Sequence, residues 1–209
     1  MMSGTGMSKT AFMAVGAVFA AMFFVSSNII PPIYVLPGVP VTFQILFVVL
    51  MAAVLGTKGS LITLGVVYGL TLVGLPMMSG FAGGIGAFAR PSGGFIIGWV
   101  FLAITVGLYK DYIEPRIETS KAKFNKGTVL IKSAGFIAAG IIGVLLDYAC
   151  GAVSMSFYNG MGFLFNFTAN IVAYIALDTA KIIIAMLFCR VFERAAGKIF
   201  IRRLHRRGM

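Results

Sequence analysis

The chain has 209 residues, of which 59% are hydrophobic and 11% are charged, and its formal net charge is +11. Soluble domains carry about 25% charged residues, and several segments here run beyond about 18 residues without a charge, the length that crosses a bilayer. These values exclude a soluble globular domain and predict a single membrane domain over residues 1–209.

The first apolar segment predicts a transmembrane helix over 10–30, which ends where Pro31 and Pro32 interrupt the helical hydrogen bonds. Its basic start and apolar run are also typical of a signal peptide. Because the apolar run continues through Ile30 and a spanning helix gives a consistent topology, we interpret it as the first span. A proline-rich loop follows, and then helices over 43–55 and 60–75 are predicted on either side of a short turn.

The stretch PMMSGFAGGIGAFARPSGGF, residues 76–95, is rich in glycine and carries Arg90 as its only charge. A helix over 94–109 and a charged loop up to residue 127 come next. The remaining predicted helices cover 128–155 and 167–192, before a basic tail. The sequence therefore predicts an all-α integral membrane protein with six transmembrane helices.

The basic residues lie at the ends of the predicted helices. Of the 17 Lys and Arg, 15 lie near the N-terminus, at the Lys58 turn, in 110–132 or in the tail, and only Arg90 and Lys181 stand apart. With six spans, all 15 fall on one face, which the positive-inside rule predicts to be cytoplasmic together with both termini. Clusters beside a membrane favour contact with anionic lipid over nucleic-acid binding.

Polar residues interrupt the last predicted helix along one face, because Asn170, Tyr174, Asp178 and Lys181 are spaced by four, four and three. A charge at this depth costs about 2.5–3.5 kcal/mol, so both charges should face the bundle interior and be partnered. They form either an ion pair that only fixes packing or a site for a polar ligand, and the small stabilisation from buried pairs favours the ligand. Asp147 in the fifth helix either helps to hold Lys181 or lies near the outer surface.

The glycine-rich stretch indicates either a ligand-binding loop or a hinge or lid. Glycines let the backbone approach a ligand closely, and the free amides at the start of helix 94–109 favour an anion. Arg90 lies beside them. The candidate binding residues of this stretch are Gly84, Gly86, Arg90, Ser92 and Gly93.

Neither a metal site nor an enzyme is predicted. Cys150 and Cys189 are not a spaced pair and His205 stands alone in the tail, so no metal or redox centre is expected. The sequence holds no nucleotide-binding motif and no constellation for nucleophilic catalysis. On the first helix, small residues spaced by four permit close helix contact in lipid; they are Gly16, Ala17, Ala20 and Ala21.

Three segments, in order, carry a resemblance to a known family. They are GVPVTFQILFVVLMAAVLG, GLPMMSGFAGGIGAFARPSGGFIIGW and LDTAKIIIA. They look like a P-V-T-x-Q loop and helix, a G-G-x-G…P-T/S-G-G-[YF] signature and a D-x-x-K element. From Ala11 to Arg194 the chain resembles BioY, the biotin-specific S component of energy-coupling factor (ECF) vitamin transporters.

The resemblance implies a six-helix ECF S-component bundle in a prokaryotic plasma membrane, which captures biotin from outside and needs no cofactor. It implies a transmembrane coupling protein of the EcfT type, contacted by the small residues of the first helix, and two cytoplasmic ATPases. Asp178 and Lys181 match the family's biotin-binding acid and lysine. Arg90 replaces a usually small residue, and we hypothesise that it pairs with the carboxylate of biotin.

The chemistry of biotin fits these residues, because its ureido ring offers N–H donors to a carboxylate and a carbonyl to an ammonium. Three alternatives stay open at this point: an S component for another vitamin, a small ion- or proton-coupled carrier that uses Asp147 and Asp178 as relay groups, and a purely structural subunit.

Overall fold

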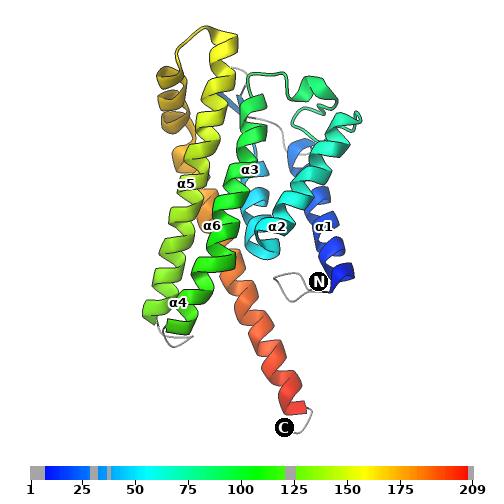
Figure 1. Ribbon diagram of the computed structural model, residues 1–209, viewed down its shortest axis with the longest axis vertical. Coiled ribbons are helices and arrows are strands. Elements are labelled where there is room, and N and C mark those ends of the chain that lie inside the picture. Colours follow the sequence, from blue (N-terminus) through cyan, green and yellow to red (C-terminus); the bar gives the residue numbers. More distant parts are fainter. Residues whose placement is uncertain (1–7, 29–32, 37–38, 121–125, 207–209) are drawn as a thin grey trace.

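A computed structural model describes residues 8–28, 33–36, 39–120 and 126–206. Five of its helices are long and apolar enough to cross a membrane, and they run side by side in one bundle (Figure 1). These are α1 (Lys9–Asn28), α2 (Gln44–Leu72), α3 (Gly93–Leu108), α5 (Lys126–Asn159) and α6 (Phe163–Arg206). The prediction of an all-α membrane bundle is confirmed, whereas the number and bounds of its helices need correction.

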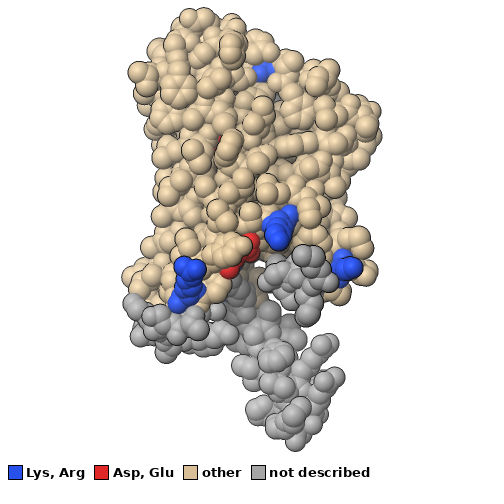
Figure 2. Space-filling model, in the orientation of Figure 1, with Lys and Arg blue, Asp and Glu red and all other residues tan. Residues whose placement is uncertain are grey.

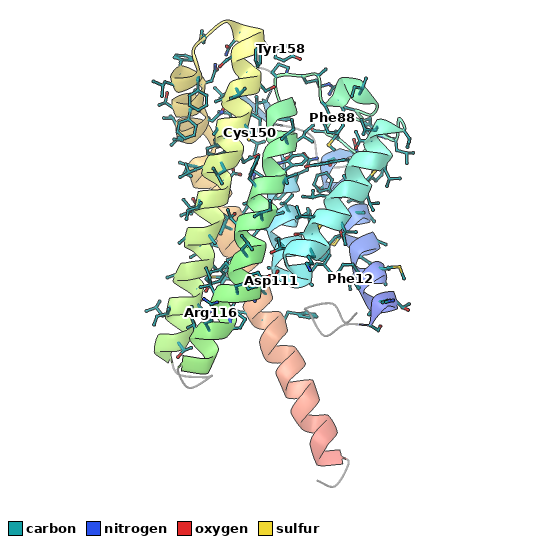
Figure 3. All side chains as sticks on the ribbon, in the orientation of Figure 1. Phe12, Phe88, Asp111, Arg116, Cys150 and Tyr158 are labelled. Atoms are coloured by element: carbon teal, nitrogen blue, oxygen red, sulfur yellow. The ribbon has the colours of Figure 1, made fainter. Side chains whose placement is uncertain are left out.

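The two helices predicted over 43–55 and 60–75 form one element, α2, which bends at Gly56 (Figure 1). Gly56 has φ 70°, a value that favours glycine, and it divides α2 into two helical segments. The N–H group of the next residue, Thr57, donates to Asp111 Oδ2 at 2.9 Å. Figure 3 shows Asp111 in the half of the bundle that also holds Arg116. The predicted four-residue turn is thus a break at a single glycine, and six helical segments are distributed over five elements.

The proline-rich segment, predicted as a loop, contains a small antiparallel hairpin of β1 (Ile33–Leu36) and β2 (Val39–Val41). The hairpin is tied to α6 through Tyr174: the Leu36 N–H donates to the Tyr174 hydroxyl at 3.1 Å, and this hydroxyl donates to the Val39 carbonyl at 3.0 Å. The glycine-rich stretch contains one short 3₁₀ helix, η1 (Ile85–Ala87).

The charged segment predicted as a loop is helical as far as residue 120. A π-helical turn, η2 (Tyr109–Ile113), and α4 (Glu114–Ser120) continue α3. Glu114 explains this extension, because its buried carboxylate pairs with Lys110 at 2.9 Å, with Lys132 of α5 at 3.6 Å, and with Arg190 of α6. The ion pairs bind three helices together where a loop was expected.

Charge is unevenly distributed along the bundle. Figure 2 shows that the Lys and Arg side chains visible on this face lie mostly near the end that carries α4, with a single basic spot near the other end. The broad band between them is almost free of charge, as a surface in contact with lipid requires. A multi-pass membrane protein follows from this band and the five apolar helices.

Candidate functional site

A cavity of about 280 Å³ opens inside the bundle, between β2, the start of α2, the start of α3, α5 and α6. This volume is close to the lower limit of ligand pockets, about 300 Å³. On α5 the cavity is lined by Asp147 and Tyr148. Two residues further along α5 is Cys150, which Figure 3 places in the half of the bundle that also holds Tyr158. Most of the wall is apolar, and its charged members are Arg90, Asp147, Asp178 and Lys181.

Asp178 and Lys181 form a buried ion pair in this wall. Lys181 Nζ lies 2.7 Å from Asp178 Oδ1, and the two residues are 8% and 3% exposed. The hydroxyl of Tyr148 on α5 donates to Asp178 Oδ2 at 2.6 Å. The pair is therefore held in a fixed position, while the ammonium retains further donors and the carboxylate further lone pairs for a ligand.

The polar face predicted on the last helix reaches the cavity with three of its four residues. Tyr174, Asp178 and Lys181 lie in the cavity wall. Tyr174 also holds the hairpin through its hydroxyl group. Asn170 does not line the cavity; it is fully buried, and its Nδ2 donates to the Tyr148 carbonyl at 3.3 Å. Asn170 thus supports the residue that positions Asp178.

The glycine-rich stretch contributes side chains rather than glycines to the cavity. Arg90 and Ser92 line it, whereas Gly84, Gly86 and Gly93 do not. Gly84 has φ 71° and serves a turn. At Gly93 a Cβ atom would lie 1.9 Å from the Phe88 carbonyl oxygen, so this glycine permits close backbone packing. The structure gives Gly84 and Gly93 roles in chain geometry, and neither lines the cavity.

Asp147 is fully buried and lies in the cavity wall. Among the described residues it makes no hydrogen bond, and the ion-pair partner of Lys181 is Asp178. Tyr148 and Gln44 are cavity residues that the sequence reasoning missed. Gln44 occupies the glutamine of the P-V-T-x-Q element, and that position was the available signal.

Gly98 of α3 faces Asp147, and its substitution gives a first prediction. A Cβ atom there would lie 2.2 Å from Asp147 Oδ1 and 2.7 Å from its Cα. We expect Gly98→Ala to force α3 and α5 apart, at a cost of about 1–3 kcal/mol, which lowers the melting temperature in detergent by several degrees. Gly65→Ala is the matched control, because nothing lies within 4 Å of its added Cβ. Equal melting temperatures for the two variants would contradict the close packing.

The four small residues of α1 divide into two pairs. A Cβ atom at Gly16 would lie 3.1 Å from Thr63 Oγ1 of α2, and Ala20 packs against the core. Ala17 and Ala21 are exposed. Gly16 therefore permits close packing of α1 on α2. Ala17 and Ala21 form a strip of small residues on the side of α1 that faces away from the bundle.

Comparisons with known proteins agree with one another. Residues 2–198 match the model of the BioY family. A biotin transporter BioY of Rhizobium etli is 34% identical over 83% of this chain and 88% of its own length. One from Rhodobacter capsulatus is 30% identical over 84% and 90% of the two chains. The crystal structure of the S-component for biotin from an ECF-type ABC transporter has a TM-score of 0.72 and 23% identity, and it covers 90% of this chain and 95% of that one.

Proposed function

This chain belongs to the BioY family, and from that premise we propose that it is the biotin-binding subunit (S component) of an ECF-type transporter and not an enzyme. The observation that carries the proposal is the buried Asp178–Lys181 pair in the cavity wall. Two charges placed inside a membrane bundle require a function or a partner. The two charges are already partners of each other, and a ligand with both donors and acceptors uses the hydrogen-bonding capacity that this pair leaves free.

The ureido ring of biotin is complementary to this pair. Asp178 accepts an N–H of the ring, and Lys181 donates to its carbonyl oxygen. A ligand that left these atoms unpaired would bind poorly, because each unpaired polar group inside the protein keeps its full desolvation cost. Trp99 and Phe95 in the cavity wall face the apolar parts of the ligand.

Arg90 lies in the cavity wall on the side of the glycine-rich stretch, and we assign it to the carboxylate of biotin. We expect Arg90→Ala to weaken biotin binding about tenfold, since a charge-assisted hydrogen bond contributes about 1.5–3 kcal/mol. For the methyl ester of biotin, which carries no charge at that position, Arg90→Ala should lower the affinity by less than about twofold. Equilibrium binding to the purified variant measures both ligands. Arg116→Ala is the control, because Arg116 lies in α4, at the opposite end of the bundle (Figure 3). Equal losses for the two ligands would remove Arg90 from this role.

The proposal includes a transmembrane coupling protein and two cytoplasmic ATPases, as the resemblance to ECF-type S components implies. The sequence of this chain holds no nucleotide-binding motif of its own. It also places both termini in the cytoplasm, a topology supported by the basic residues that flank the helices.

Uptake of labelled biotin by cells that lack other biotin transporters tests this proposal. We expect uptake when the chain is expressed with a coupling module, and its loss when the ATP-binding sites of that module are inactivated. Uptake that instead follows an ion gradient, with no ATPase present, would support a secondary carrier and contradict the proposal.

A further inference from the structure

The carboxylate of Asp147 has no hydrogen-bond partner in the part of the chain that the structure describes. The residue is 0% exposed, and neither Oδ1 nor Oδ2 has a hydrogen-bond donor among those residues. A carboxylate removed from water without partners costs several kcal/mol. Buried polar groups are almost always hydrogen-bonded, so this one requires an explanation.

Space for this carboxylate is built into the packing of α3 against α5. Because Gly98 has no side chain, there is room for Asp147 Oδ1: a Cβ atom at Gly98 would lie 2.2 Å from this oxygen. The next residue along α5, Tyr148, holds Asp178 through its hydroxyl. Both residues lie in the cavity wall, so α5 brings an unpartnered carboxylate and the support of the Asp178–Lys181 pair to the same ligand space.

The other charged groups of the cavity already have uses. Lys181 pairs with Asp178 Oδ1, and Tyr148 donates to Asp178 Oδ2, so both oxygens of Asp178 carry one hydrogen bond before any ligand arrives. Arg90 belongs to the side of the cavity formed by the glycine-rich stretch. Asp147 is the acidic group whose two oxygens remain without a donor within the described residues.

We propose that Asp147 is a second ligand-binding carboxylate, which accepts one N–H group of the bound ligand while Asp178 accepts another. This inference rests on the proposed function and deepens it. A cyclic urea presents N–H donors on both sides of its carbonyl, and two carboxylates and one ammonium match these three groups. Selection then favours an intact urea with both N–H groups over ligands that offer a single donor.

The test combines one variant with two ligand analogues. We expect Asp147→Asn to bind biotin at least about tenfold more weakly than the wild type, because the amide replaces one acceptor oxygen by a donor. Biotin methylated at one ureido nitrogen, and biotin methylated at the other, should each bind the wild type at least tenfold more weakly. In Asp147→Asn, the penalty for one of these two methyl groups should fall to about twofold or less.

Three results would overturn the inference. Asp147→Asn with wild-type biotin affinity would show that the carboxylate is not used. Penalties for both methyl groups that stay unchanged in the variant would show the same. If the variant does not fold, the wild type still tests the inference. A methylated analogue that binds the wild type as tightly as biotin does would show that the N–H group at that position has no acceptor in the protein.

The proposed function fails separately. A wild-type protein that does not bind biotin contradicts the proposed function and the inference together. A wild-type protein that binds biotin, and whose Asp147→Asn variant binds it equally well, contradicts only the inference. Desthiobiotin serves as a control ligand, because it keeps both ureido N–H groups and lacks the sulfur atom.

Discussion

Asp178→Asn is expected to lower the affinity for biotin by about 100-fold or more. The substitution replaces one acceptor oxygen by an NH2 donor and leaves the ammonium of Lys181, now 2.7 Å from the position of a neutral amide, buried without its counter-charge. Removal of one member of a buried pair costs about 3–5 kcal/mol, and a lost charged hydrogen bond costs about 1.5–3 kcal/mol. Titration of the purified variant in detergent with labelled biotin measures the loss.

A double variant separates binding from folding. Asp178→Asn combined with Lys181→Met removes both charges, so thermal stability should recover relative to Asp178→Asn, while biotin binding stays lost. Thr168→Val on the exposed side of α6 is the matched control and should bind as the wild type does. Affinity of Asp178→Asn within threefold of the wild type would show that the pair only fixes the packing of the bundle.

Ala17→Trp is expected to abolish biotin uptake while biotin binding to the isolated subunit stays within about twofold of the wild type. Ala17 is exposed on α1 beside Ala21, so a large side chain there does not disturb the core. In lipid, helices associate through small residues that let their backbones approach closely, and an indole would hold the coupling protein away. Co-purification with the coupling module, and uptake by cells, measure the two effects.

Val172→Trp is the control for this prediction, because Val172 is 85% exposed on α6, a different helix. We expect this variant to assemble and to transport. If Ala17→Trp co-purifies with the coupling module and transports at the wild-type rate, the strip formed by Ala17 and Ala21 is not the assembly surface.

Much of the fold could be predicted from the sequence because lipid imposes strong constraints. A single apolar segment that crosses lipid satisfies its own backbone hydrogen bonds as a helix, so the existence and order of the helices follow from the long apolar segments. The ends of the helices could not be predicted where contacts between helices decide them. Glu114 forms ion pairs with Lys132 of α5 and Arg190 of α6. These pairs stabilise a helix in a segment whose charged residues predicted a loop.

The site was predictable in one part. The spacing of Tyr174, Asp178 and Lys181 placed three cavity residues on one helical face, because the period of a single helix is enough for that inference. Tyr148 could not be found in this way, since its contact with Asp178 joins residues 30 apart on different helices. For the glycine-rich stretch, composition suggested ligand contact, but Gly93 is needed for backbone packing, a requirement that composition alone cannot separate from ligand contact.

Equilibrium binding of labelled biotin to the purified wild-type chain, in competition with other vitamins, tests the central claim most directly. We predict saturable binding of one biotin per chain, displaced by unlabelled biotin and not by vitamins without a cyclic urea. Tight binding of a different vitamin, or no saturable binding of biotin to a folded chain, would contradict the assignment of the Asp178–Lys181 cavity to biotin.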